Sequence, residues 1–392
     1  MKTTIRLRKK YFLDFFTSIF IFMTISIPSL KLIYSTQLIN IICFCSLALL
    51  TVIKFRIHLT YEKKYLLFFW FIFSVLLLFT VFYGAFDKEF GYFIELFYFI
   101  FILIFIIILS NYNILIKVGR LIFFWGMFIA IWQLTFGINT NIDAGQHYLT
   151  VSMPLGAALA YTTRFFFSTE DNWEKRLFFA ISFFVIFIAL STLLSRSAFI
   201  YNFLILILFF LSYIFINKNM TFIYKLISVF ILSISIITTY SYFSDKIKFR
   251  QVDRFDRLVT NTDSESRMSE KYLPAINYIS SKPIFGYGMG ASKGLYGNYP
   301  HNIFLEVLSI GGIILLFPFL FILILYFKVV YLILKYHLNN SYLVGGSAFS
   351  LFFFLQFNSS FPLTSAYIPI GSIVLLIIGF YDFKKIHTSK TQ

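Results

Sequence analysis

The sequence predicts an all-α integral membrane protein with about twelve transmembrane helices. Hydrophobic residues make up 59% of the 392 residues, charged residues make up only 13%, and the mean hydropathy is +0.83. A soluble protein carries about a quarter charged residues, so this chain must expose much of its surface to lipid. The apolar residues also recur in runs near the roughly 20 residues that cross a bilayer. No stretch between these runs is long enough for a separate domain, which predicts one polytopic membrane domain over residues 1–392.

Each predicted span is an apolar run bounded by polar or charged residues. The eleventh run is short and contains a pair of glycines, so a tilted or partly re-entrant segment is an alternative there. The predicted spans are 11–29, 37–53, 65–83, 91–110, 118–137, 148–166, 177–193, 197–216, 222–242, 303–327, 342–357 and 362–381.

The distribution of Lys and Arg predicts the orientation. With both termini in the cytoplasm, the inner segments hold 21 of the 33 basic residues and the short outer loops hold three. The remaining nine lie in a long outer loop between the ninth and tenth spans, at 243–302. Basic residues concentrate in short cytoplasmic loops, so this asymmetry fixes the predicted topology. The net charge of +16 then reports orientation and contact with anionic headgroups, and no nucleic-acid partner is expected.

Cysteine, metal and nucleotide patterns are absent from this sequence. Cys43 and Cys45 both fall inside the second predicted span, so we expect no disulfide framework or thiolate metal site. We also find no metal-ligand spacing and no phosphate-binding loop, and therefore predict no metal and no cofactor.

The first candidate site residues lie where the long loop returns to the membrane. His301 precedes Asn302, which is placed to cap the tenth predicted span. Glu306 lies one turn further in, on the same helix face as Asn302. A carboxylate at that depth needs a partner or a water-filled cavity. His301 is either a structural residue at the start of a helix or a general base.

Two arginines are predicted on the same side of the membrane. Arg196 is the only charged residue between Arg176 and Lys218, and lies in a tight turn between the seventh and eighth spans. It is either an interfacial side chain that reaches for headgroups or an anion ligand, for which the guanidinium fork suits phosphate oxygens. Arg267 precedes Tyr272, Ile276 and Ile279, whose helical spacing predicts an amphipathic helix on the outer leaflet.

A glycine-rich stretch follows the predicted amphipathic helix, which we expect to end at Ser281-Lys282-Pro283. In Gly286-Tyr287-Gly288-Met289-Gly290 the glycines alternate, but no strand precedes them and no βαβ unit surrounds them. The stretch is therefore not a dinucleotide fingerprint. We predict a flexible hinge between the amphipathic helix and the tenth span.

Three motifs in this order resemble the bacterial O-antigen ligase and polymerase (Wzy) superfamily. The first is Leu-Ser-Arg-Ser-Ala-Phe around Arg196, and the second joins Ser-Arg-Met at Arg267 to Lys-Pro-x2-Gly-Tyr-Gly-x-Gly at 282–290. The third is Pro-His-Asn-x-Phe-Leu-Glu-x4-Gly-Gly at 300–312. The resemblance in motif runs from about Ser191 to Gly312, and the span count and the long outer loop extend it to the whole chain.

The resemblance implies a GT-C-like fold and a metal-independent glycosyltransferase in the bacterial inner membrane, with its active site facing the periplasm. The donor would be an oligosaccharide on undecaprenyl diphosphate, with membrane lipids and a chain-length regulator protein as further partners. Arg196 and Arg267 match the diphosphate-binding arginines of the family, and His301 matches its proposed base. Asn302 and Glu306 would support the base.

Three interpretations of the function follow from these residues. A polymerase would add the glycan to a lipid-linked repeat unit, and the composition rich in Phe, Ile and Tyr favours it by association. A ligase would transfer the glycan to lipid A-core. A flippase for the same lipid-linked sugar is the transport alternative, but transporters usually place ionisable groups and broken helices near the midplane. Here the polar residues gather near the outer side instead. A purely structural membrane protein would leave His301, Arg196 and Arg267 unexplained.

Overall fold

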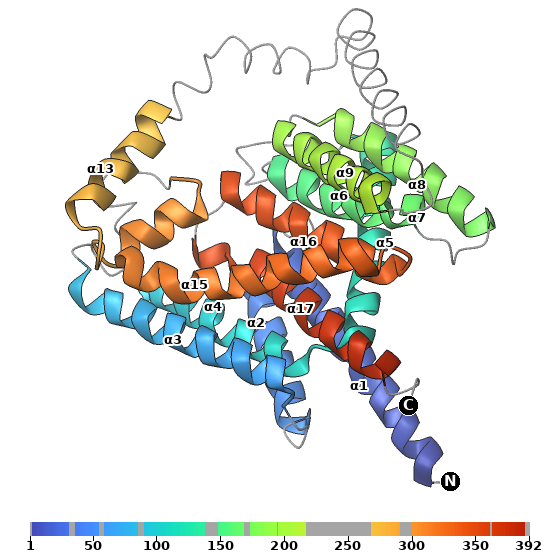
Figure 1. Cartoon of the computed structure of the whole chain (residues 1–392), viewed down its shortest axis with the longest axis horizontal. Coiled ribbons are helices and arrows are strands. Elements are labelled where there is room, and N and C mark those ends of the chain that lie inside the picture. The colour runs from blue at the N-terminus through green and yellow to red at the C-terminus, as the bar shows by residue number, and fades with distance from the viewer. Residues whose placement is uncertain are drawn as a thin grey trace, which may run out of the picture. The chain divides into compact units, whose positions relative to one another are not determined.

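All regular structure in the described part of the chain is helical (Figure 1). The computed structural model describes residues 2–30, 36–54, 59–84, 90–137, 148–167, 173–193, 195–216, 268–290, 300–360 and 363–388. The helices are α1 (Lys2–Leu30), α2 (Thr36–Lys54), α3 (Tyr61–Tyr83), α4 (Phe90–Leu109), α5 (Tyr112–Phe136), α6 (Tyr148–Thr162), α7 (Arg164–Phe167), α8 (Trp173–Ser191), α9 (Arg196–Ile216), η2 (Met268–Tyr272), α13 (Leu273–Ser281), α15 (Ile303–Tyr336), α16 (Ser341–Ser360), η3 (Leu363–Ser365) and α17 (Tyr367–Thr388).

Eleven of the twelve predicted spans fall on these helices, and the predicted span at 222–242 lies outside the described residues. Among the described residues, α3, α5, α9, α15 and α17 are long and apolar enough to cross a membrane. Shorter apolar helices lie at Tyr11–Ile27, Leu38–Lys54 and Ile94–Leu109. The chain is therefore a helical membrane protein, while the count of twelve spans and the position of the long loop stay predictions.

Helix α3 illustrates why these helices belong in lipid. One face packs inward with Leu66, Trp70, Phe73 and Leu77, at helical spacing. The opposite face is also apolar, and it exposes the aromatic rings of Phe68, Phe71, Phe79 and Phe82. Water would penalise such a face, whereas hydrocarbon accommodates it.

The chain divides into two compact units, with boundaries that fall inside α5, α15 and α16. Unit 1 comprises Met1–Leu121, Ser264–Val329 and Phe353–Gln392, and unit 2 comprises Ile122–Asp263 and Val330–Phe352. In unit 1, α17 packs against α1, α3 and α4, and α2 packs against α1 and α4. Nearly all of the apolar part of α17 is buried, which makes it the central helix of this unit.

Buried polar and charged side chains join α1, α2, α3 and α4 in unit 1. Lys54 of α2 forms an ion pair with Asp14 of α1 at 2.9 Å, and both side chains are less than a tenth exposed. Asn111, between α4 and α5, donates to the same carboxylate at 3.5 Å. Lys63 of α3 donates to the carbonyl of Ile108 in α4 at 2.6 Å. These residues all lie at predicted inner ends of spans, so this end of unit 1 agrees with the alternating topology.

Unit 2 is built around α6, which packs against α8 and α9. Glycines allow close approaches on two sides of it. A Cβ at Gly126 of α5 would overlap Ala158 of α6, and a Cβ at Gly345 of α16 would lie 2.7 Å from the ring of Tyr161 in α6. Small residues at helix crossings are typical of membrane helix packing. The glycine-containing eleventh span is accordingly one continuous helix, α16, over Ser341–Ser360.

Candidate functional site

Asn302 caps α15, as predicted. Its side-chain oxygen accepts hydrogen bonds from the backbone N–H of Phe304 at 3.0 Å and of Leu305 at 3.1 Å. These N–H groups have no partner within the helix, so the cap fixes the residue at which α15 begins.

His301 adopts a left-handed backbone conformation directly before this cap. Its φ is 51°, and no other non-glycine residue in the described part of the chain has a positive φ. The conformation costs a histidine roughly 1–3 kcal/mol and persists only where its surroundings hold it. The side chain is half-buried, and its Nδ1 atom is buried. Strained residues of this kind concentrate at ligand and catalytic sites.

Glu306 has the partner that its depth requires. Its residue is 3% exposed, and its carboxylate accepts a hydrogen bond from the backbone N–H of Leu363 at 2.9 Å. The N–H of Glu306 in turn donates to the carbonyl of Asn302 at 3.0 Å. Glu306 therefore connects the first turn of α15 to η3, the short helix that precedes α17.

Helix α15 is broken at Gly312, where φ is 60° and ψ is −158°. The break leaves carbonyls before it and N–H groups after it without helical partners. The Pro283–Gly288 segment supplies them. Tyr287 and Gly288 donate to the carbonyls of Ser309 and Ile310 at 2.8 Å each, and Ile313 donates to the carbonyl of Pro283 at 2.9 Å.

Glycine is required on both sides of this junction. Gly286 has a φ of 65°, and a Cβ there would lie 2.6 Å from the carbonyl of Ile310. A Cβ at Gly312 would overlap the carbonyl of Ile284. The prediction of a flexible hinge at the glycine-rich stretch is therefore wrong for the described residues up to 290. The stretch alternates glycine because two backbones meet there, and it is docked by hydrogen bonds.

The end of α3 completes this junction. The hydroxyl of Tyr83 donates to the carbonyl of Phe285 at 2.6 Å, and the N–H of Met289 donates to the carbonyl of Thr80 at 3.2 Å. Gly84 follows α3 and lies against Gly288 and Met289. Sequence reasoning missed Tyr83 and Gly84, and their only local signal is a glycine at the end of an apolar run. The segment 283–289, the docked loop, thus holds α3 and α15 together at the break that follows Glu306.

The helix predicted after Arg267 is present as η2 and α13, and α13 ends at Ser281 as expected. The end of α13 contacts the docked loop through Tyr287. The hydroxyls of Ser281 and Tyr287 lie 2.6 Å apart, and the ammonium of Lys282 lies 4.4 Å from the centre of the Tyr287 ring. Ile276 is exposed, which leaves an apolar side chain on the free surface of α13. Its location in an extracytoplasmic loop stays a prediction.

The two predicted anion ligands are less fully described. Helix α8 ends at Ser191 and α9 begins at Arg196, so the predicted tight turn is present. The Arg196 side chain and all of Arg267 lie outside the described residues. Arg196 belongs to unit 2, whereas His301, Asn302 and Glu306 belong to unit 1. The structure therefore brings together His301, Asn302 and Glu306, and the role of the two arginines stays a prediction.

Within the described ranges, no group of three or more His, Cys, Asp and Glu side chains is placed to hold a metal ion. Cys43 is buried, Cys45 is exposed, and both are free thiols. Among the described residues, the polar groups at the start of α15 include the Asn302 cap, the His301 ring and the Glu306 carboxylate.

Residues 177–320 match the family model described as O-antigen ligase. The resemblance to the O-antigen ligase and polymerase superfamily is confirmed. The matched segment contains all five predicted site residues, the docked loop and the break in α15. This O-antigen ligase-type segment implies a glycosyltransferase-like enzyme in a multi-pass membrane protein. No curated protein matches the chain.

Proposed function

We propose that the protein is an O-antigen polymerase. It transfers a glycan from undecaprenyl diphosphate to a lipid-linked repeat unit on the outer leaflet of the bacterial inner membrane. The observation that carries this proposal is His301, held in a left-handed conformation at the start of α15 inside the segment that matches the O-antigen ligase family. A histidine is a suitable general base near neutral pH because its ordinary pKa lies close to it.

The proposed step is a displacement at the anomeric carbon of the donor sugar. His301 accepts the proton of an acceptor hydroxyl while that oxygen forms a bond to the anomeric carbon. The bond between this carbon and the diphosphate oxygen breaks, and its electron pair leaves with the diphosphate. Negative charge therefore grows on the leaving group, where Arg196 and Arg267 would stabilise it through paired N–H donors. This arrangement needs no metal ion, and metal independence is part of the proposal.

The packing around His301 supports a role as a positioned base. The Asn302 cap fixes the start of α15, Glu306 anchors its first turn to Leu363, and the docked loop fixes the break one helical segment further along. A general base has to lie within hydrogen-bond reach of the acceptor hydroxyl whose proton it takes. The backbone that carries the base must therefore be held in a fixed position.

A ligase is the second candidate, because the matched family model is described as O-antigen ligase and the match does not separate the two activities. A ligase would use the same donor and the same base but would transfer the glycan to lipid A-core. The flippase alternative gains no support, because the family match points to glycan transfer.

The lipopolysaccharide banding pattern of a deletion strain separates the two candidates. Loss of a polymerase leaves a single repeat unit on the core. Loss of a ligase leaves no repeat unit on the core and accumulates lipid-linked polymer. The matched control is the deletion strain complemented with the full chain, which should restore the parental ladder. A deletion strain with an unchanged ladder would contradict both candidates.

A further inference from the structure

Unit 2 contains a buried arginine that the proposed reaction does not use. Arg164 follows α6 and begins α7, and its residue is 5% exposed. One terminal nitrogen donates to the hydroxyl of Tyr161 at 2.6 Å. Gly345 of α16 makes room for the stem, because a Cβ there would lie 3.0 Å from Cδ of Arg164.

Four aromatic rings surround the guanidinium of Arg164. Its central carbon lies 4.4–5.1 Å from the ring centres, which is within the range of cation–π attraction. The rings come from α6, α7, α8 and α16, all within unit 2. They are Tyr161, Phe165, Phe179 and Tyr342.

This aromatic cage provides no anion. The Nε of Arg164 is buried and has no hydrogen-bond partner, and no carboxylate in the described residues lies within ion-pair distance of the guanidinium. Aromatic faces attract the charge but offer no lone pair in the plane of the N–H groups. Buried guanidinium groups normally pair with a carboxylate or a phosphate, whose two oxygens match the fork. The unpartnered Nε therefore indicates a ligand that the described residues do not supply.

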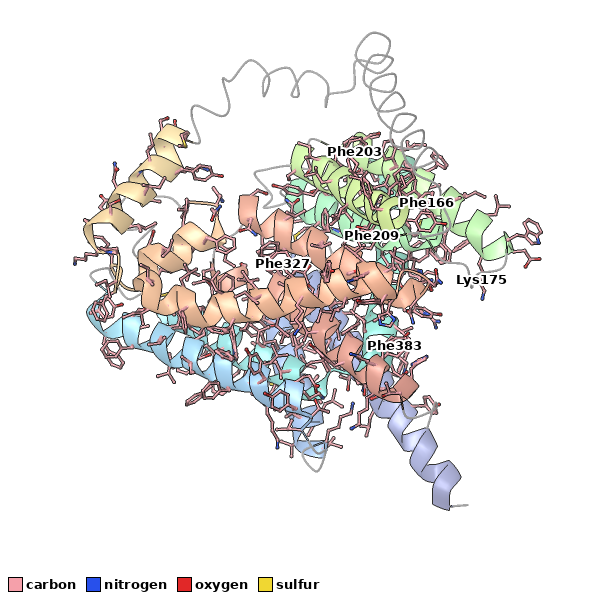
Figure 2. All side chains as sticks on the ribbon, in the orientation of Figure 1. Phe166, Lys175, Phe203, Phe209, Phe327 and Phe383 are labelled. Carbon is pink, nitrogen blue, oxygen red and sulfur yellow. The ribbon has the colours of Figure 1, made fainter. Side chains whose placement is uncertain are left out.

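The location of the cage favours a phosphate. Arg164 follows the last turn of α6, and Phe179 and Tyr342 lie near the first turns of α8 and α16, so the cage is at one end of the helices of unit 2. Lys175 on the first turn of α8 and Lys335 near the end of α15 are exposed, and Lys175 is labelled at the end of α8 in Figure 2. The positive-inside rule predicts that these ends face the cytoplasm, at the level of lipid headgroups.

We propose that Arg164 and its aromatic cage form a phosphate-binding site at the predicted cytoplasmic end of unit 2. The guanidinium binds two phosphate oxygens through Nε and a terminal nitrogen, while the four rings hold its plane in place. The phosphate belongs to an anionic lipid headgroup or to a soluble phosphate, and both present the same oxygens to the fork. This site shares no residue with the proposed transfer site, to which His301, Arg196 and Arg267 are assigned.

Lipid retention by the purified full chain tests this site. The delipidated protein is incubated with phosphatidylglycerol or with diacylglycerol of the same acyl chains, and retained lipid is counted by native mass spectrometry. We expect wild type to retain phosphatidylglycerol at least about tenfold better than diacylglycerol, and Arg164→Lys to lose about tenfold in that preference. Lys335→Gln, which removes an exposed charge at the same end, should change the preference far less.

The two phosphate sources give different results. Inorganic phosphate that binds wild type and displaces phosphatidylglycerol assigns the site to a soluble phosphate, and failure to bind assigns it to lipid.

Equal retention of phosphatidylglycerol by wild type and Arg164→Lys overturns the proposal. The proposal is also overturned if phosphatidylglycerol is retained only by the double variant Glu170→Gln with Asp171→Asn. That result would mean that an acidic side chain of the protein itself pairs with the Arg164 guanidinium. If Arg164→Lys does not fold, the melting temperature of wild type decides: it must rise more with phosphatidylglycerol than with diacylglycerol.

Discussion

At the residue scale, the start of α15 combines a strained backbone at His301 with a side-chain cap and a buried carboxylate bond. Asn302 satisfies two free N–H groups, Glu306 binds the N–H of Leu363, and His301 carries the strain between a proline and the cap. These contacts hold the His301 backbone in a conformation that it would not adopt alone. The chemistry proposed for His301 and its neighbours can be tested one side chain at a time.

Replacing His301 with alanine should lower the rate of polymer formation by about two to four orders of magnitude, because the acceptor hydroxyl loses its base. The measurement is polymer length and yield from purified lipid-linked repeat units. His387→Ala, on the exposed last turn of α17, is the matched control and should keep the wild-type rate. His301→Ala at near wild-type rate, with normal insertion and donor binding, would show that His301 is structural.

The arginine prediction separates diphosphate ligands from headgroup anchors. Arg196→Lys and Arg267→Lys should each keep expression and insertion but strongly weaken use of the donor, since a lysine point charge cannot reproduce paired N–H donors. An anchor needs only a long cationic stem, which lysine provides. The assay is polymer formation with and without EDTA, and EDTA should change little. Full activity of both lysine variants would make the arginines anchors, and loss of wild-type activity in EDTA would reveal a metal site.

Glu306 offers a third test, because its carboxylate accepts a backbone hydrogen bond. Glu306→Gln keeps an acceptor oxygen for the Leu363 N–H and should retain most of the activity and the melting temperature. Glu306→Ala leaves that N–H unpaired and should cost about 1–3 kcal/mol of stability, with a matching loss of activity. Thermal unfolding in detergent and the polymer assay measure both. If Gln is as damaging as Ala, the charge itself is needed and Glu306 takes part in the chemistry.

At the scale of elements, the break in α15 and the docked loop form one junction. The two motifs that carry it lie about twenty residues apart, yet each supplies the hydrogen-bond partners that the other lacks. Tyr83 and Gly84 at the end of α3 join the same junction. The docked loop therefore stabilises the break in α15 and is more than a connection between two helices.

Two glycines with nearly the same φ test how tightly the docked loop packs against α15. Gly312 has a φ of 60° and faces the carbonyl of Ile284, whereas Gly137 has a φ of 63° and nothing within 4 Å of the position that a Cβ would take. Gly137→Ala should cost about 1 kcal/mol through backbone strain, and Gly312→Ala about 3 kcal/mol because its φ and ψ are almost exclusive to glycine and a steric overlap is added. Thermal unfolding of the two variants gives the comparison. Equal losses would mean that the loop is not packed against α15.

At the scale of the whole molecule, the topology predicted from the charges can be compared with the contacts inside unit 1. Residues at the ends of spans predicted to lie on the same side of the membrane are expected to meet. Asp14, Lys54, Lys63 and Asn111 meet at predicted inner ends, while Tyr83 meets the docked loop at a predicted outer end. Residues that the charge asymmetry assigns to one side are thus in contact with each other. These contacts are the same whichever end of unit 1 faces the cytoplasm, so they do not assign the two sides of the membrane.

Cysteine labelling assigns the two sides. In a background without Cys43 and Cys45, single cysteines at positions 265 and 293 should react with an impermeant reagent in intact spheroplasts, because the long loop is predicted outside. A cysteine at position 218 should react only after permeabilisation. The measurement is the labelled fraction before and after permeabilisation. The reverse pattern would place the proposed transfer site in the cytoplasm and remove the case for an outer-leaflet substrate.

The sequence by itself determined the features that depend on nearby residues. The helical runs, the Asn302 cap, the helix that ends at Ser281 and the tight turn before Arg196 all follow from patterns within a few turns. Composition decided that this is a membrane protein, because the balance of apolar and charged residues is a property of the whole chain. The order of three motifs was enough to indicate the family.

Only the tertiary structure decided which distant groups satisfy one another. The Asp14–Lys54 pair spans 40 residues, the Glu306–Leu363 bond spans 57, and the bond from Tyr83 to Phe285 spans 202. No local pattern identifies such partners, because a buried charge or a broken helix shows only that a partner is needed. The prediction of a hinge in the glycine-rich stretch failed for this reason: glycine suits a free hinge and a close backbone contact equally well, and the fold selects the contact.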